Sequence, residues 1–223
     1  MWFLALLACN AGADLPPHEV VHLDTEDGLR LEADWYAGGS RGVLLLHMTP
    51  VKYDRTSWPG DFIRGLLDDG ASVLVPDRRG AGGSEGEAED AFEGPDGVLD
   101  ARAAVDFLVA NGVEDLSIVG ASNGTTTTLD YAVTAAAEGD PVPDAIVLMS
   151  PGSYTENQHA FADLEHDRVM FTYPPEERDW PEAQRALDPG TWRFCEYEGG
   201  AHGTFLFEAA PVVAEDLRAW LRG

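Results

Sequence analysis

The sequence predicts an α/β fold: a mostly parallel eight-stranded sheet flanked by helices. Three observations support this prediction. The chain has 223 residues, which suits one domain with a sizeable core and leaves no room for a second. Strand-like apolar runs alternate with helical segments, an order that builds parallel sheets. The run at residues 116–119 also leads directly into a glycine-rich turn at residues 120–124, before a helical segment.

The predicted elements begin with two strands that form a hairpin, and strand–helix repeats follow. The strands are expected at residues 20–23, 29–36, 43–47, 72–76, 116–119, 145–150, 169–173 and 192–197. The helices are expected at residues 62–69, 98–110, 122–137, 181–187 and 205–221. Residues 84–96 are acidic and rich in glycine, which favours a surface loop. In such a sheet, loops at the carboxyl ends of the strands carry the functional groups.

The turn after the fifth predicted strand has the pattern Gly120-x-Ser122-x-Gly124. A strand that turns abruptly into a helix strains the backbone of the serine and lifts its hydroxyl clear of both elements. Glycines two residues before and after the serine prevent collisions within the turn. The pattern therefore indicates Ser122 as a nucleophile. Since the chain has 24 glycines, the motif needs partner residues to be specific.

His202 is the candidate partner of Ser122. It follows the last predicted strand in the segment Glu198-Gly-Gly-Ala-His202-Gly, where glycines on both sides leave an uncrowded loop. Such a loop can hold an imidazole over the serine hydroxyl and let it act as a general base. Without Ser122, the same histidine would be interpreted as a surface residue in a glycine-rich turn.

Five stretches of the chain, in this order, resemble the α/β-hydrolase superfamily, and within it the small, capless dienelactone-hydrolase-like esterases. They are residues 43–50, 54–58, 73–84, the Ser122 turn and residues 200–203. The resemblance covers residues 18–223, which we expect to form the hydrolase domain. It implies a serine esterase with a Ser-His-acid triad that cleaves small or medium carboxylic esters, or lactones, through an acyl-enzyme. We expect neither a metal nor an organic cofactor.

The acid of the triad is where this sequence departs from the family. Members usually carry an aspartate in a Gly-x-x-Asp turn after the seventh strand, and the corresponding residues 168–181 lack this turn. Counting four residues back from Pro181 selects Glu177, with Asp179 and Glu176 as alternates. A glutamate can accept the hydrogen bond from imidazole Nδ1–H and stabilise the imidazolium that forms.

In this fold two backbone N–H groups hold the oxyanion. The resemblance assigns one of them to Asn123, the residue after the nucleophile. The other lies in the turn after the third strand, where members read His-Gly-x and this chain reads His47-Met48-Thr49. Thr49 is the expected donor, with Met48 as the alternate because the glycine is replaced. Four further positions of the resemblance are expected to be structural: His47, Asp77, Arg79 and Ser84.

Lidded lipases and cap-bearing hydrolases insert a helical subdomain between the sixth and seventh strands. In this chain the connection, about residues 152–167, is short. We therefore expect no cap domain and an open site. Three aromatic residues are candidates to line this site and contact the substrate: Trp58, Tyr154 and Phe205.

The charge of the chain bears on its partners. The formal net charge is −26, from 40 acidic and 14 basic residues. A surface of this kind is soluble, disfavours nucleic acid as a partner and makes neutral esters easier substrates than anions. The six histidines show no metal-ligand spacing with acids or cysteines.

Two alternatives for the function remain open. A peptidase or an acyltransferase would use the same triad, because the difference lies in what attacks the acyl-enzyme. A catalytically inactive binding protein would keep the scaffold with a degraded acid and an altered oxyanion turn. A carboxylate within hydrogen-bonding reach of His202 would favour an enzyme.

Residues 1–17 resemble a bacterial lipoprotein signal followed by a polar tether. A short apolar run ends at Cys9, where the resemblance implies a lipid after export, and the run is too short to span a bilayer. The match departs at two points: no basic residue precedes the run, and Leu7 stands two residues before Cys9. We expect an exported, membrane-anchored protein, with a cytoplasmic enzyme as the alternative. The only other cysteine, Cys195, leaves no disulfide framework.

Overall fold

The computed structural model describes residues 15–223, except 50–51, 93–94, 155–163, 165 and 200. Most of the lipoprotein-like segment, including Cys9, lies outside the described residues, so export and lipidation stay predictions. In the part of the chain that is described, no helix combines the length and the apolar character needed to cross a membrane.

The predicted fold class is confirmed. The described residues form an eight-stranded sheet in the spatial order β1-β2-β4-β3-β5-β6-β7-β8. β1 and β2 form the expected hairpin, β2 is also antiparallel to β4, and the remaining neighbours are parallel. The strands are β1 (Glu19–Asp24), β2 (Arg30–Tyr36), β3 (Arg41–Leu46), β4 (Ala71–Pro76), β5 (Asp115–Ala121), β6 (Ala145–Met149), β7 (Val169–Tyr173) and β8 (Arg193–Glu196).

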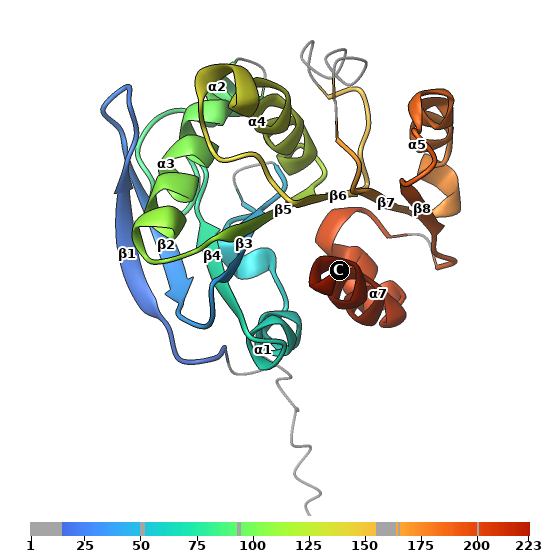
Figure 1. The fold of residues 1–223 in the computed structure, drawn as a ribbon, viewed down its shortest axis with the longest axis horizontal. Helices are drawn as coiled ribbons and strands as arrows, with labels where there is room; N and C mark the ends of the chain where they lie inside the picture. Colours follow the sequence, from blue (N-terminus) through green and yellow to red (C-terminus); the bar gives the residue numbers. More distant parts are fainter. Residues whose placement is uncertain (1–14, 50–51, 93–94, 155–163, 165, 200) are drawn as a thin grey trace, which may run out of the picture.

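Helices cover both faces of the sheet (Figure 1). α1 (Gly60–Asp68) and α7 (Val212–Arg222) pack on one face, and α3 (Gly97–Ala110) and α4 (Gly124–Glu138) pack on the other. The shorter helices are α2 (Ala88–Phe92), α5 (Asp179–Gln184) and α6 (Leu206–Ala209). Single 3₁₀ turns are η1 (Arg55–Ser57), η3 (Pro175–Glu177), η4 (Arg185–Leu187) and η5 (Gly203–Phe205).

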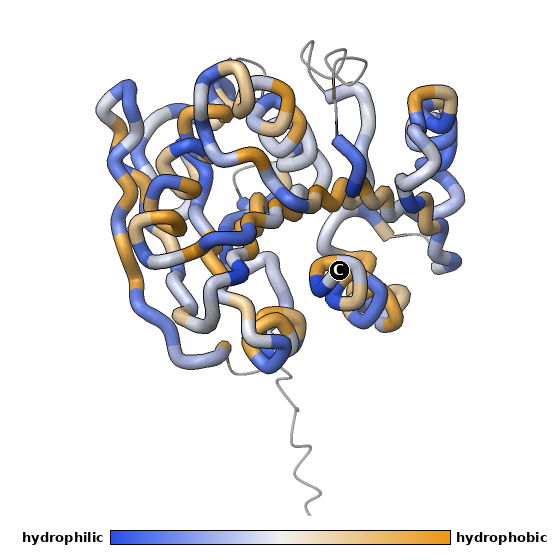
Figure 2. Tube along the Cα trace, viewed as in Figure 1, coloured by the Kyte–Doolittle hydropathy of each residue, from blue (hydrophilic) through white to orange (hydrophobic). Residues whose placement is uncertain are grey.

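The central strands are apolar on both sides because helices cover both faces. In β3, Val43 and Leu45 pack toward α1 and α7, whereas Leu44 and Leu46 pack toward α3 and α4. This alternation follows from the two-residue period of a strand. Figure 2 shows the hydrophobic residues concentrated along these strands. The sheet is thus a rigid support for the loops at its carboxyl edge.

Two predictions about the helices are wrong. The helix expected at residues 205–221 is divided into η5, α6 and α7. Pro211 explains the division, because proline disfavours a helical conformation in the residue before it, and Ala210 has φ −137° and ψ 82°. The loop expected at residues 84–96 contains α2, whose Ala88 and Ala91 are buried one helical turn apart.

The connection between β6 and β7, residues 150–168, is too short for a cap domain, since an independently folded unit needs about 40 residues or more. The loops that follow β5, β7 and β8 therefore form a site on the carboxyl edge of the sheet without an inserted domain above them.

Candidate active site

Ser122 lies in the sharp turn between β5 and α4. Its φ of 51° is in the left-handed region, and its N–H donates to Met149 O at 2.8 Å. A Cβ at Gly120 would overlap the carbonyl oxygen of Gly124, and a Cβ at Gly124 would overlap that of Leu46. The predicted strained serine between two obligatory glycines is confirmed, because both glycines lie in close contact with neighbouring backbone.

His202 and Glu177 complete a continuous hydrogen-bonded chain with Ser122. His202 Nε2 lies 2.6 Å from Ser122 Oγ, and His202 Nδ1 lies 2.6 Å from Glu177 Oε1. Ser122 follows β5, Glu177 follows β7 and His202 follows β8. The sheet edge thus brings His202 to Ser122, 80 residues away in the chain, and to Glu177, 25 residues away. In this arrangement Nδ1 can carry a hydrogen toward the carboxylate while Nε2 accepts the serine proton.

Glu177 is half-buried at the end of η3. Burial would raise the pKa of its carboxyl, but the hydrogen bond from His202, together with the effect of the Ser150 hydroxyl, outweighs burial and holds the pKa below its ordinary value. The carboxylate is therefore ionised at neutral pH. The two alternates, Glu176 and Asp179, have exposed side chains, and the structure brings Glu177 to the imidazole.

The three aromatic candidates for substrate contact lie in different places. Tyr154 is 38% exposed, and its ring lies edge-on to His202 with centroids 6.3 Å apart. Phe205 is 46% exposed and lies edge-on to Tyr53. Trp58 is only 1% exposed and packs against Phe62 and Phe207, so it belongs to the core and does not line the site. Its large apolar ring is better buried than left at an open edge.

The turn after β3 begins with His47 and Met48, and the carbonyl oxygen of each accepts a hydrogen bond. His47 Nε2 accepts from Arg78 N–H at 2.9 Å, so the ring hydrogen is on Nδ1 and donates to Met48 O at 2.8 Å. Arg78 Nη1 donates to His47 O at 3.3 Å. His47 is thus the structural residue that the sequence predicts. Thr49 is half-buried beyond this turn, and Met48 is buried, with its sulfur against Thr204 Oγ1.

Arg78 was missed by the sequence reasoning. Its guanidinium is buried, and Nη2 donates to Asn123 Oδ1 and to Thr127 Oγ1, each at 2.9 Å. Together with its bond to His47 O, these contacts connect the turn after β3 to the start of α4. A buried arginine needs such partners, because burial disfavours its charge. The one sequence feature that could have pointed to Arg78 is its place between Asp77 and Arg79 in the 73–84 stretch.

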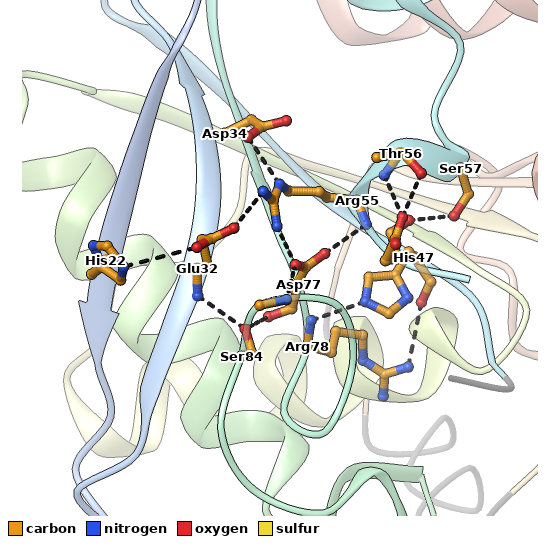
Figure 3. Close-up of polar contacts among 12 residues, drawn as sticks. His22, Glu32, Asp34, His47, Arg55, Thr56, Ser57, Asp77, Arg78 and Ser84 are labelled. Carbon is orange, nitrogen blue, oxygen red and sulfur yellow. Dashed lines mark hydrogen bonds and ion pairs between the residues drawn. The ribbon is translucent and has the colours of Figure 1, made fainter. Parts of the chain in front are cut away.

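A second polar cluster supports the loop behind the turn (Figure 3). Arg55 Nε donates to Asp34 Oδ1 at 2.9 Å, and the other guanidinium nitrogens bind Glu32 and Asp77. Asp77 also accepts from the backbone N–H of Arg55 at 2.8 Å, and Ser84 Oγ donates to Asp77 O at 2.6 Å. These contacts fasten η1 to β2 and β4, a structural role for Asp77 and Ser84.

Arg79 has a similar structural place on the other side of the loop. Its Nε donates to Asp100 Oδ1 at 2.8 Å, and its Nη1 donates to Asp27 Oδ2 at 2.9 Å. Among the residues that the structure describes, no group of three or more His, Cys, Asp and Glu side chains is arranged to hold a metal ion.

His47 makes the stability of the fold depend on pH. Burial, followed by the charge of Arg78, lowers the pKa of His47 to about 3. Above about pH 6.5 the imidazole is neutral in both states; below it, the unfolded chain takes up a proton that the folded chain excludes. The free energy of unfolding should therefore fall as the pH falls, by about 2 kcal/mol from this residue between pH 7 and pH 5.

Urea unfolding of the wild type and of His47→Gln at both pH values checks this prediction. The variant should be less stable at pH 7 but should lose about 2 kcal/mol less than the wild type on going to pH 5. Equal losses in the two proteins would mean that His47 can be protonated in the folded state.

The sheet order and the serine turn after β5 define the class of α/β hydrolases. The chain belongs to this family, because the family model described as "alpha/beta hydrolase fold" matches residues 43–219. No curated protein matches the chain in a sequence search.

Solved structures with the same fold include several hydrolases. The esterase Pf2001 of Pyrococcus furiosus has 17% identity and a TM-score of 0.74, over 92% of this chain and 90% of the esterase. A "predicted CIB-like hydrolase" of Thermoplasma acidophilum has 19% identity and a TM-score of 0.70, over 92% and 98%. An esterase of a Rhodococcus species has 16% identity and a TM-score of 0.66, over 91% and 98%. At these identities the likeness is one of fold.

Proposed function

We propose that this protein is a serine hydrolase, similar to the dienelactone-hydrolase-like esterases, that cleaves small or medium carboxylic esters or lactones. The observation that carries the proposal is the unbroken hydrogen-bonded chain from Glu177 through His202 to Ser122. A side-chain nucleophile, a base and a group that orients the base stand here in the order that acyl transfer requires.

The proposed reaction begins with attack of Ser122 Oγ on the ester carbonyl carbon. His202 Nε2 takes the hydroxyl proton, and Glu177 accepts the Nδ1 hydrogen bond and stabilises the imidazolium. The N–H groups of Asn123 and Thr49, with Met48 as the alternate, hold the oxyanion. As the ester C–O bond breaks, His202 gives the proton to the leaving alcohol. Water, deprotonated by His202, then attacks the acyl-enzyme carbonyl, and the bond to Ser122 Oγ breaks to release the carboxylic acid and the free serine.

Small neutral esters are the proposed substrates for three reasons. The short β6–β7 connection leaves the site without a cap domain, and the exposed rings of Tyr154 and Phe205 lie beside the histidine loop. The net charge of −26 disfavours anionic substrates at low salt. The esterases among the fold relatives support the same reaction class. The Glu177–His202 hydrogen bond argues against an inactive binding protein.

Labelling with a fluorophosphonate tests the proposal without knowledge of the substrate. The wild type should gain one adduct by intact mass, mapped to the peptide that contains Ser122, and Ser122→Ala should gain none. Ser153→Ala removes an exposed serine on a neighbouring loop and should be labelled like the wild type. Absence of labelling in a folded wild type would refute the proposed activity. A panel of esters, lactones and peptides would then separate esterase from peptidase specificity.

A further inference from the structure

Ser150, directly after β6, has an unusual backbone conformation. Among the described residues, Ser122 and Ser150 are the non-glycine residues with positive φ, both at 51°. They follow adjacent strands, since Ala121 pairs with Met149. Glycine takes this conformation at no steric cost, whereas a serine is strained in it. A serine in place of glycine therefore indicates a use for its hydroxyl group.

The contacts of Ser150 connect β7, the loop after β6 and the loop that carries His202. Its side chain is fully buried, and its Oγ accepts from Gly203 N–H, next to His202, at 2.8 Å. Its N–H donates to Thr172 O at 2.7 Å, which fixes it to β7. Its carbonyl oxygen accepts from the Tyr154 hydroxyl at 2.6 Å. The backbone of Ser150 is thus bonded to β7, and its side chain is bonded to the loop that carries His202.

The hydroxyl hydrogen of Ser150 is not used in the contact with Gly203, because Oγ is the acceptor there. One carboxylate oxygen of Glu177, Oε1, is bonded to His202, and the other, Oε2, is buried without a hydrogen-bond partner. The Ser150 hydroxyl contributes to holding the pKa of the Glu177 carboxyl below its ordinary value. A hydroxyl can accept one hydrogen bond and donate another at the same time. Ser150 can therefore accept from Gly203 while it donates to Glu177.

We propose that Ser150 is a positioning residue, whose hydroxyl bridges the loop of the proposed base, His202, to the proposed acid, Glu177. This inference rests on the proposed function. Two separate loops carry the acid and the base, and a shift in either would open the 2.6 Å contact between Nδ1 and Oε1. Hydrogen bonds of the Ser150 backbone to β7 and Tyr154 hold the left-handed conformation, from which Oγ reaches the loop of His202.

Two substitutions separate the hydroxyl from the backbone strain. Ser150→Ala and Ser150→Gly both remove the hydroxyl, but only glycine also removes the strain. Both should lower kcat about 10–100-fold with little change in KM, as expected for the loss of a hydrogen bond to a charged group. Ser117→Ala, in a buried serine at the opposite end of β5, is the matched control and should keep the wild-type kcat. If Ser150→Gly keeps the wild-type kcat, the hydroxyl has no positioning role.

A double-mutant cycle with Glu177→Gln tests whether Ser150 acts through the acid. If it does, Ser150→Ala should lower kcat by a smaller factor in the Glu177→Gln background than in the wild type. Full additivity of the two losses would overturn the bridge. The pH profile gives a second readout. The titratable groups near Ser150 are Glu177, Tyr154 and His202, the last of which precedes the Gly203 that Ser150 contacts. Without the hydroxyl the pKa of the Glu177 carboxyl should rise, so the loss in kcat caused by Ser150→Ala should grow as the pH is lowered.

The outcomes also separate this inference from the proposed function. Unlabelled wild-type protein in the fluorophosphonate assay would reject the hydrolase activity itself. A labelled wild type whose rate of labelling is unchanged in both Ser150→Ala and Ser150→Gly would reject only the role of Ser150. Thermal melting of each variant shows whether the fold is retained before rates are compared.

Discussion

Glu177→Gln is expected to lower kcat/KM by about 10⁴-fold, mostly through kcat. The amide of glutamine can donate a hydrogen bond to His202 Nδ1, and the ring hydrogen then moves to Nε2. An imidazole in that tautomer cannot accept the proton of Ser122, although the three side chains keep their places. Hydrolysis of a chromogenic ester by the purified variant measures the loss.

The neighbouring carboxylates supply matched controls for this substitution. Glu176→Gln and Asp179→Asn each remove one negative charge from the same loop, and their exposed side chains should make the rates change by less than about twofold. A large loss in either control, with Glu177→Gln nearly normal, would place the acid elsewhere. Wild-type rates in all three variants would favour a site that works without a carboxylate.

The fold was predictable because its signals are local. Central strands covered on both faces are continuous apolar runs, and the chain shows them at β3, β4, β5 and β6. The helix boundary at Pro211 was also present in the sequence, but the apolar pattern continues from Leu206 to Leu221 and suggests one helix. The apolar period thus outweighed the proline signal and gave the wrong boundary.

The residues of the candidate site were predictable where their neighbours in the sequence indicate their role. Glycines flank Ser122 and His202 in the sequence, and these glycines report the tight turns. Glu176, Glu177 and Asp179 lie in the same acidic stretch, but the η3 turn leaves Glu176 exposed and Glu177 half-buried. A count of residues selected Glu177, with alternates, but its contact with His202 depends on how β7 and β8 pair.

Ser150 and Arg78 were beyond the sequence reasoning because their properties come from distant neighbours. The φ of Ser150 reflects the place of β6 between β5 and β7, with hydrogen bonds to Thr172 and Gly203. The burial of Arg78 results from packing under α4, whose N-cap residue, Asn123, lies 45 residues later in the chain. Trp58 was wrongly expected to contact substrate, since nothing in its local sequence separates a core aromatic residue from one that lines a site.

Arg78→Ala is expected to lower the free energy of unfolding by about 3–5 kcal/mol. The side chain is 2% exposed, and its loss would leave a cavity and take the donor from His47 O, Asn123 Oδ1 and Thr127 Oγ1. Buried acceptors without donors lose about 1–3 kcal/mol each, and the cavity adds to this. Denaturant unfolding at pH 7 measures the change. A loss below about 1 kcal/mol would mean that water or rearranged side chains satisfy these acceptors.

Arg78→Met separates the stability of the fold from the order of the site. Burial lowers the pKa of Arg78 to about 10, so the group is still a cation at pH 7, and its hydrogen-bond partners are all neutral. Methionine fills similar space without a buried charge, so it should be more stable than alanine by about 2 kcal/mol. It cannot tie the His47 peptide to Asn123, so it cannot connect the turn that carries the proposed donor Thr49 to the turn that carries the proposed donor Asn123. We therefore expect kcat to fall about 10–100-fold in a folded protein, since preorganised donors are effective only when held in place. A folded Arg78→Met variant with the wild-type kcat would show that the turn after β3 holds its geometry through His47 alone.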